Sequence, residues 1–330
     1  MMANSLDHIF VNNFKSIRNL ELHGFKRINL FIGRPNVGKS NIIEALSLFS
    51  LPYLRENTSK RLNSLIRLEH ETELFYNGNT VNSGLIRTNG GKVELRYHPK
   101  EGLNIVLALS GGKLFDFHVD EKLLVKGGRK NDSFESPIKR YTYKSEVAYK
   151  KGHGKYLIPP YGFNLLSIIE QYGELKSQVT TLFKEYGLDI AFDKSSQTVK
   201  VIQSNDKDGM FLIPYNSIAD TLQRIIFFKA AIASNNDSVL LFEEPEAHSF
   251  PPYMAHLTQE MIHGPNNQYF IATHSPFILN DLLENSRNEL SVFLVHYENS
   301  ATSVKQLSEQ ELHDVFQNGV DLFTNSESFI

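Results

Sequence analysis

The eight residues 33–40 constrain this chain more than any other stretch, because they read GRPNVGKS. They match the P-loop pattern of a glycine, four residues of any type, and then Gly-Lys-Ser/Thr. The preceding run 28–32 (INLFI) is apolar and predicts a buried parallel strand, whereas residues 41–49 predict a helix that Pro52 breaks. A strand, a glycine loop and a helix in this order are the context in which the pattern binds nucleotide phosphates.

Each residue type in the loop has a chemical task. Gly33 and Gly38 let the backbone curl so that its N–H groups point at phosphate oxygens, and the following helix adds the positive end of its dipole. Lys39 supplies a charge for the β- and γ-phosphates and should face solvent without ligand, and Ser40 can ligate Mg²⁺. The predicted nucleotide-binding residues are Asn36, Gly38, Lys39, Ser40 and Asn41.

A second motif begins with the apolar run 239–242 (VLLF) and continues as EEPE. This is the Walker B pattern, in which the first carboxylate serves Mg²⁺ and the second polarises the attacking water. Glu243 and Glu244 should therefore be the metal carboxylate and the catalytic carboxylate, since neighbours at a strand end point to opposite sides. A further apolar run, 268–272, leads to His274, which we predict to contact the γ-phosphate and the attacking water as a second catalytic residue.

Length and composition narrow the class of protein. The chain has 330 residues, enough for one large domain or two, and a net charge of −3, which gives no global signal for nucleic acid. It has no cysteine, which excludes disulfides, thiol catalysis and Cys-ligated metal sites. Because it shows neither a signal peptide nor an apolar run of membrane-spanning length, we expect a soluble, cytoplasmic protein.

The first part of the chain otherwise predicts mostly strands. Residues 9–11 and 20–22 read as a strand pair, and residues 55–70 predict a helix because leucines recur among charged residues. From residue 73 to 125 apolar and polar residues alternate between glycine turns. We interpret this stretch as an antiparallel meander added to the core sheet.

Residues 122–156 stand out by composition. They hold ten Lys or Arg side chains against three acidic ones, with four tyrosines interleaved. Basic residues with aromatic neighbours are typical of a nucleic-acid or partner-docking surface, although a solvated loop is the commoner meaning of one charge run. We keep both interpretations open.

The remaining segments complete the predicted organisation. Residues 163–187 predict a helix pair, and residues 189–203 predict short strands. We divide the sequence into an N-terminal ATPase lobe (1–126), an insert with a basic-aromatic segment and a helical lobe (127–214), and a C-terminal ATPase lobe (215–330).

These motifs together resemble the ABC-class ATPases of the RecF/SMC/OLD group, OLD standing for overcoming lysogenization defect. The order of NFKSI (13–17), the P-loop, EEPEAH (243–248) and THSP (273–276) carries the resemblance, which frames residues 9–295. It implies an α/β P-loop fold of the ABC/RecF type, with a mixed central sheet, flanking helices, the meander and a small helical insert. It also implies ATP and Mg²⁺ as cofactors, and a dimer in which each P-loop faces the signature helix of the other subunit.

The signature helix is expected at residues 215–224. Ser217 should be its N-cap with Asp220 as capping-box partner, and Ser217 should contact nucleotide in trans. Leu222, Ile225, Ile226 and Ala230 should form its buried stripe. The glycines of a typical Leu-Ser-Gly-Gly signature are missing, so the sequence departs from the family pattern here.

The resemblance favours one function over two alternatives. The short insert and the lack of coiled-coil heptads resemble the ATPase subunits of bacterial phage-defence and abortive-infection systems. With no room for a Toprim domain after residue 295, a separately encoded nuclease or toxin should be the effector. We expect a slow ATPase whose nucleotide-dependent dimerisation controls that effector. The alternatives are a DNA-repair or chromosome-associated ATPase that binds DNA through residues 122–156, and a nucleotide-sensing scaffold without turnover.

Overall fold

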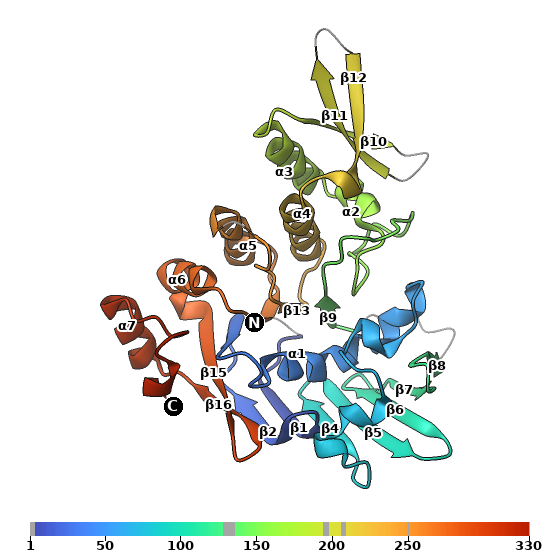
Figure 1. Cartoon of the computed structure of the whole chain (residues 1–330), viewed down its shortest axis with the longest axis vertical. Helices are drawn as coiled ribbons and strands as arrows, with labels where there is room; N and C mark the ends of the chain where they lie inside the picture. The colour runs from blue at the N-terminus through green and yellow to red at the C-terminus, as the bar shows by residue number, and fades with distance from the viewer. Residues whose placement is uncertain (1–3, 128–135, 194–197, 206–208, 250, 330) are drawn as a thin grey trace. The chain divides into compact units, whose positions relative to one another are not determined.

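A computed structural model describes residues 4–127, 136–193, 198–205, 209–249 and 251–329 (Figure 1). The chain forms two compact units, each built from discontinuous segments. The first unit comprises residues 1–140, 237–244 and 266–330, and the second comprises residues 141–236 and 245–265. The division into three segments made from the sequence stays a prediction.

The first unit contains a six-stranded sheet in the order β16-β15-β3-β14-β13-β9. Strand β3 pairs in parallel with β14 and β15, β13 pairs in parallel with β14, and β16 runs antiparallel to β15. The bounds are β3 (Ile28–Ile32), β9 (Ile138–Tyr141), β13 (Val239–Glu243), β14 (Gln268–Ala272), β15 (Leu290–Glu298) and β16 (Ala301–Gln306). Every residue of β3 and β14 is buried, as expected of strands covered on both faces. The strands predicted at 28–32, 239–242 and 268–272 are confirmed.

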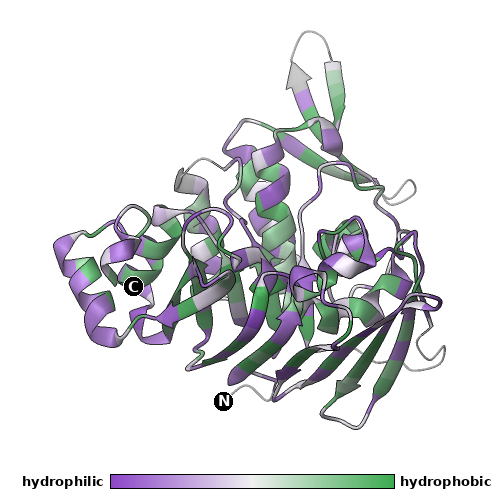
Figure 2. Cartoon of the chain, turned by 60° about the horizontal axis from the view of Figure 1, so that its bottom comes forward, coloured by the Kyte–Doolittle hydropathy of each residue, from purple (hydrophilic) through white to green (hydrophobic). Residues whose placement is uncertain are grey.

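A second, antiparallel sheet of seven strands has the order β2-β1-β4-β5-β6-β7-β8. Its strands are β1 (His8–Phe14), β2 (Ile17–His23), β4 (Gly84–Thr88), β5 (Gly91–His98), β6 (Gly102–Leu109), β7 (Leu114–Val119) and β8 (Val125–Gly127). Hydrophobic and hydrophilic residues follow one another along these strands (Figure 2), and in β6 and β7 every second residue is buried. The antiparallel meander is therefore confirmed. The prediction that it extends the core sheet is wrong, because strands with one apolar face need a separate layer to cover that face.

Helix α1 (Lys39–Ser47) fills the space between the two sheets (Figure 1). Ile42, Ile43 and Leu46 are fully buried and belong to one apolar cluster with Val93 and Ile105 of the seven-stranded sheet. The same cluster contains Val239, Leu241 and Phe270 of the six-stranded sheet. The P-loop helix is thus held from both sides. Helices α6 (Pro276–Asn285) and α7 (Glu309–Asn318) complete the regular helices of this unit among the described residues.

Two helix predictions in this unit are wrong. Residues 55–70 form no α-helix but the end of the 3₁₀ helix η1 (Leu48–Glu56) and the short turn η2 (Leu62–Ser64). Pro52 does not end the helical run that begins with α1. It lies inside the 3₁₀ helix η1, which continues directly from α1. A proline cannot donate the i→i−4 hydrogen bond of an α-helix, and the chain around Pro52 accordingly winds as a 3₁₀ helix. Further 3₁₀ turns, η3 (Glu71–Leu74) and η4 (Tyr76–Gly78), precede the meander, which starts only at β4.

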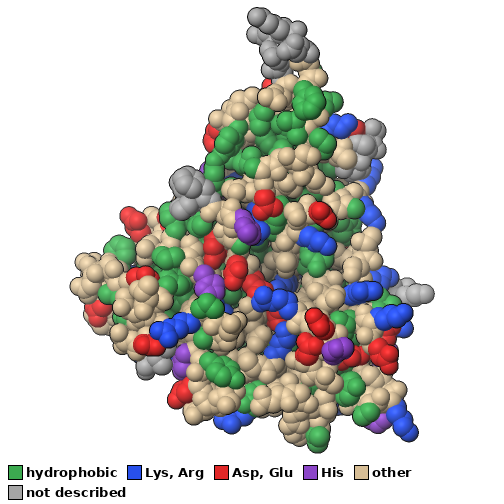
Figure 3. Space-filling model, in the orientation of Figure 1, with side chains coloured by type: hydrophobic (Ala, Val, Ile, Leu, Met, Phe, Trp, Pro, Cys, Tyr) green, Lys and Arg blue, Asp and Glu red, His purple; other side chains and the backbone are tan. Residues whose placement is uncertain are grey.

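The second unit is mainly helical. The helix pair predicted at 163–187 is confirmed as α2 (Leu165–Gln171) and α3 (Gly173–Lys184), and α4 (Asp220–Ala233) packs against α5 (Pro251–His263). A three-stranded antiparallel sheet follows the pair, with β10 (Asp189–Asp193), β11 (Thr198–Asn205) and β12 (Gly209–Pro214). Met210 and Phe211 of β12 are 68% and 67% exposed. Figure 3 shows hydrophobic side chains gathered on the surface of this part of the molecule.

We predict that Ile43→Ala destabilises the first unit by about 2–5 kcal/mol, since it leaves a cavity in the layer between the two sheets. Urea unfolding followed by circular dichroism measures the change. Val81→Ala is the matched control, because Val81 is 93% exposed, and it should change stability by no more than about 0.5 kcal/mol. Equal effects of the two substitutions would contradict the central place of α1.

Candidate nucleotide site

The P-loop lies between the end of β3 and the start of α1, and two glycines allow its path. Gly33 has φ +149°, and an added Cβ would lie 2.2 Å from the backbone oxygen of Val295. Gly38 has φ +103°, and an added Cβ would lie 2.0 Å from Oγ1 of Thr302. A side chain at position 33 would clash with the backbone of β15, and one at position 38 would clash with the side chains of Thr302 and Ser16 and strain the left-handed backbone.

Hydrogen bonds among hydroxyl and amide side chains hold the P-loop in place. The Asn41 amide donates to Ser16 Oγ at 2.6 Å, Ser16 and Thr302 share a 2.6 Å hydrogen bond, and Thr302 Oγ1 donates to the Val37 carbonyl at 3.0 Å. Ser16 belongs to the NFKSI motif, so this motif supports the P-loop. Asn41, predicted to bind nucleotide, uses its side-chain amide in that support.

The same motif anchors its surroundings through two other residues. The Asn13 amide donates to the backbone oxygens of Asn79 and Asn82 at 3.0 and 2.8 Å. Lys15 pairs with Glu44, a fully buried residue of α1, and donates to the Arg67 carbonyl at 2.6 Å. The turn between β1 and β2 thus contacts both α1 and the segment that carries Arg67.

Lys39 does not face solvent, so that prediction is wrong. It is 5% exposed, and its ammonium donates to the backbone oxygens of Gly33 and Arg34 at 2.9 and 2.7 Å. A buried ammonium needs hydrogen-bond acceptors, and two carbonyls of the loop supply them. Burial lowers the pKa of Lys39 from 10.5 to about 8, although Glu244 and Glu243 act in the opposite direction.

Glu243 and Ser40 lie close together, as two ligands of one metal ion must. The Ser40 hydroxyl donates a hydrogen bond to the Glu243 carboxylate at the end of β13. A carboxylate and a hydroxyl are the oxygen donors that Mg²⁺ accepts beside substrate phosphates, so the residues present fit the ion. Among the described residues, no group of three or more His, Asp or Glu side chains could hold a metal ion.

Two arginines also hold Glu243, and the sequence analysis did not identify either one as part of this site. Arg67 pairs with one carboxylate oxygen, and Nη2 of Arg140 lies 2.5 Å from the other. Burial alone would raise the pKa of the Glu243 carboxyl, but Arg140, Ser40 and Arg67 outweigh it and hold that pKa below its ordinary value. Glu243 is therefore charged, and it has three partners.

Glu244 and His274, the predicted catalytic residues, are brought together at the ends of neighbouring strands. Nε2 of His274 lies 3.6 Å from Oε1 of Glu244, and the Glu244 N–H donates to the Ala272 carbonyl at 2.8 Å. Glu244 has φ +42°, an uncommon value for this residue type that turns its side chain away from the line of β13. Burial, and then the charge of Lys39, lower the pKa of His274, which favours the neutral imidazole.

Comparison with known proteins places this geometry in a family. The family model described as "AAA domain, putative AbiEii toxin, Type IV TA system" matches residues 28–280, which include the P-loop, Glu243, Glu244 and His274. The chain belongs to this AAA family.

Two relatives resemble parts of this chain. The DNA replication and repair protein RecF of Caldanaerobacter subterraneus subsp. tengcongensis is 31% identical over 109 residues, which are 33% of this chain and 28% of RecF. An uncharacterized protein of Methanocaldococcus jannaschii is 43% identical over 44 residues, which are 13% of this chain and 20% of that protein. The chain therefore matches less than a third of the length of either relative.

Solved structures resemble the AAA domain over nearly its whole length. An SMC head bound to the C-winged helix domain of ScpA gives a TM-score of 0.51 at 12% identity and covers 92% of this chain and 97% of that one. An SMC head with an extended coiled coil, bound to the C-terminal domain of ScpA from Pyrococcus furiosus, gives 0.50 at 12% identity and covers 95% and 98%. The chain has the α/β fold of SMC- and ABC-type ATPase heads, as the sequence predicted. No helix in the described part of the chain has the length and apolar character needed to cross a bilayer.

The predicted start of the signature helix is wrong, although its buried stripe is confirmed. Helix α4 of the AAA domain begins at Asp220 with Ala219 at its N-cap, whereas Ser217 lies in the preceding 3₁₀ turn η5 (Tyr215–Ser217). Asp220 is no capping-box partner, because its carboxylate accepts a hydrogen bond from the Tyr143 hydroxyl at 2.8 Å. Leu222, Ile225, Ile226 and Ala230 are at most 7% exposed.

Fewer basic residues of the basic-aromatic segment lie on the surface than its composition predicted. Lys139 and Arg140 are each 5% exposed, and Arg140 pairs with Glu243 of the candidate nucleotide site instead of facing solvent. Arg129 and Lys130, with Asp132 and Glu135, lie outside the described residues. In the second unit the exposed basic residues of the segment are Lys144, Lys150, Lys151 and Lys155.

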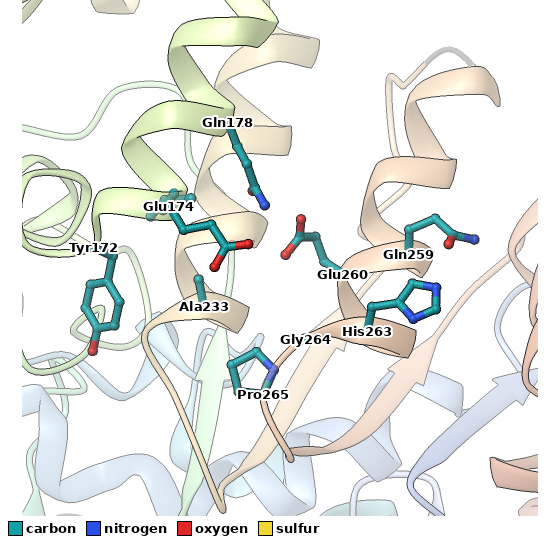
Figure 4. A pocket seen from close by; sticks show the side chains of 10 residues that line it. Tyr172, Glu174, Gln178, Ala233, Gln259, Glu260, His263, Gly264 and Pro265 are labelled. Atoms are coloured by element: carbon teal, nitrogen blue, oxygen red, sulfur yellow. The ribbon is translucent and has the colours of Figure 1, made fainter.

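A separate cavity of about 550 Å³ lies in the second unit (Figure 4). The carboxylates of Glu174 and Glu260 face each other across it, with Gln178 and His263 nearby, and Glu260 pairs with Lys229 of α4. None of the predicted nucleotide-binding or catalytic residues lines this cavity. The candidate nucleotide site is therefore the P-loop and the strand ends beside it.

We predict that nucleotide affinity falls by about tenfold between pH 7.5 and pH 9, because the phosphates require the protonated Lys39 and its pKa in the free protein is about 8. Bound phosphates raise that pKa, so binding takes up a proton above pH 8 and weakens as the pH rises. Fluorescence titration with an ATP analogue measures the change. The Lys39→Arg variant should show no such decline, since a guanidinium stays charged. A flat profile of the wild type up to pH 9 would contradict the lowered pKa.

Proposed function

We propose that this AAA domain binds Mg·ATP and hydrolyses it slowly. The observation that carries this proposal is the meeting of two pairs beside Lys39, namely Ser40 hydrogen-bonded to Glu243, and Glu244 at 3.6 Å from His274. The first pair suits a magnesium ion, and the second suits an attacking water. Nucleotide hydrolysis is also what the AAA and ABC families suggest in general.

In the proposed reaction each residue has one task. The loop N–H groups and Lys39, which exchanges the carbonyls of Gly33 and Arg34 for phosphate oxygens, hold the β- and γ-phosphates. Ser40 and Glu243 would hold Mg²⁺, which supplies positive charge to those phosphates when bound. Glu244 accepts a hydrogen bond from the water and orients it, and neutral His274 lies where it can contact the same water or the γ-phosphate.

We further propose that ATP binding brings two AAA domains together and that this dimer controls a separately encoded effector, a nuclease or toxin, in anti-phage defence. The fold shared with SMC heads supports a head–head arrangement, and the family description, with its toxin and type IV toxin–antitoxin terms, supports a defence role. Ser217, outside α4 in η5, would offer its hydroxyl to the nucleotide of the partner head.

A DNA-binding role is the second candidate, and the similarity to RecF over 109 residues is the observation that favours it. The exposed lysines of residues 144–155 would then contact phosphates. A scaffold that binds ATP and never hydrolyses it is the third. A turnover assay separates this scaffold from the other two functions.

We predict that Glu244→Gln lowers the hydrolysis rate by about 10²–10⁴-fold and leaves ATP affinity nearly unchanged, because the substitution removes the charge that positions the water and keeps every phosphate contact. The closed dimer should then accumulate with ATP and Mg²⁺ and dissociate with ADP. Size-exclusion chromatography with light scattering measures the mass of the protein, and so the formation of this dimer. Glu21→Gln is the matched control, since it removes a comparable pair, Glu21 Oε1 at 3.2 Å from His23 Nε2, in β2 of the antiparallel sheet.

The outcomes separate catalysis from assembly. Wild-type turnover together with a mass that does not depend on nucleotide would contradict the role of Glu244. Lost turnover in an oligomer that forms with or without nucleotide would keep the catalytic assignment and remove only the nucleotide-driven dimer. Glu243→Gln should instead impair Mg²⁺-dependent binding.

We predict that replacing Lys144, Lys150 and Lys151 by Ser leaves ATP binding intact and weakens any binding of DNA. Each lost phosphate contact should reduce the slope of log affinity against log salt by about 0.9 for duplex DNA. DNA binding measured by fluorescence anisotropy at several salt concentrations gives that slope. If this variant binds DNA and the effector as the wild type does, the segment is a solvated loop and not a docking surface.

A further inference from the structure

We propose that Arg140 is a positioning residue that neutralises Glu243 and thereby lets the site bind nucleotide phosphates even before Mg²⁺ arrives. The inference rests on the proposed function, because it assigns Glu243 to the metal. It goes beyond that function by naming a residue outside the P-loop and Walker B motifs and by giving it a measurable effect on the dependence of binding on Mg²⁺.

The contacts of Arg140 fix its guanidinium in place. Its side chain is 6% exposed, and Nη2 lies 2.5 Å from Glu243 Oε2. Nη1 donates to Ser47 Oγ at 3.1 Å, and the Arg140 N–H donates to Ser50 Oγ at 3.0 Å. Ser47 closes α1 and Ser50 lies in η1, so the helix that follows the P-loop also holds the arginine.

Arg67 pairs with the same carboxylate but is far more exposed to solvent. Its side chain is 68% exposed, and it also binds Glu44 through Nε at 3.2 Å. It can exchange Glu243 for water or a ligand at small cost, whereas Arg140 cannot leave without exposing a buried carboxylate. Arg140 is therefore the permanent counter-charge of Glu243, and Arg67 is the exchangeable one.

The chemistry of the guanidinium decides what this counter-charge does. An arginine stays protonated and has no lone pair for a metal, so Arg140 cannot serve as a magnesium ligand. It can only balance the carboxylate. Without it, only the exchangeable Arg67 would balance Glu243. The negative charge left beside Glu244 would then repel the phosphates of ATP until bound Mg²⁺ offset it.

The expected result concerns the ratio of two dissociation constants for an ATP analogue, one in EDTA and one with Mg²⁺. In Arg140→Gln this ratio should rise by about tenfold, since repulsion by Glu243 acts mainly when no metal covers it. In Arg140→Lys, which keeps a charge, the ratio should stay close to the wild-type value. Fluorescence anisotropy gives both constants without any turnover.

Two controls distinguish this role from a merely structural one. Arg27→Gln removes a similar pair, Arg27 Nη2 with Glu289 Oε2 at 2.6 Å, outside the site and should leave the ratio unchanged. In a Glu243→Gln background, Arg140→Gln should no longer change the ratio, because the charge it balances is gone. If Arg140→Gln alone does not fold, this comparison of Glu243→Gln with the double variant still decides the question.

The results that overturn the proposal are specific. An equal loss of affinity with and without Mg²⁺ in Arg140→Gln, a ratio in Arg140→Lys as high as in Arg140→Gln, or an undiminished effect of Arg140→Gln in the Glu243→Gln background would each reject it while wild-type binding upholds the nucleotide site. A wild type that binds no ATP in either condition would overturn the proposed function and this inference with it.

Discussion

The carboxylate of Glu243 is the interaction on which the candidate site depends. It is 14% exposed, and its charge is balanced by Arg67 and Arg140 with a hydrogen bond from Ser40. Breaking a buried ion pair on one side costs about 3–5 kcal/mol, while an exposed pair contributes about 0–1 kcal/mol. The buried Arg140 therefore contributes far more to this arrangement than the exposed Arg67. Residues from β13, β9, α1 and the segment after η2 are held together at one carboxylate.

The two sheets explain why these groups meet. Strand β13 carries Glu243 to the end of the six-stranded sheet, and the neighbouring β14 carries His274 to the same end, because the two strands are parallel. Helix α1 starts at that end and is covered by apolar side chains of both sheets. The polar end of a helix with buried sides has little freedom to move, so the loop that precedes it is positioned by the core rather than by its own flexibility.

The sequence predicted those parts of the site that follow from short contiguous patterns. The strand, loop and helix around Lys39, the acids after β13 and the histidine after β14 are local signals, and parallel strand ends bring them together. Arg67 and Arg140 could not be predicted in this way, because their partner lies far along the chain and nothing in their neighbours distinguishes them from surface arginines. A motif indicates which ligand atoms Lys39 contacts, but not which backbone acceptors bind its ammonium when no ligand is bound, so the sequence wrongly predicts that Lys39 faces solvent. The residue type of Ser217 favours a helix start there, whereas non-helical backbone at Ile218 and Ala219 delays α4.

The hydrogen bond from Thr302 to Val37 bears on the order in which the chain is made. The ribosome makes residues 33–40 long before β15 and β16. The Thr302 side chain that holds the loop belongs to β16, and the carbonyl that lies against Gly33 belongs to β15. Strand β3 also lies between β14 and β15, so its two neighbours emerge long after it. Such distant pairings close slowly and leave apolar strands uncovered in the meantime. A nascent chain thus carries the P-loop motif without the side chains that hold its shape until β15 and β16 have been made.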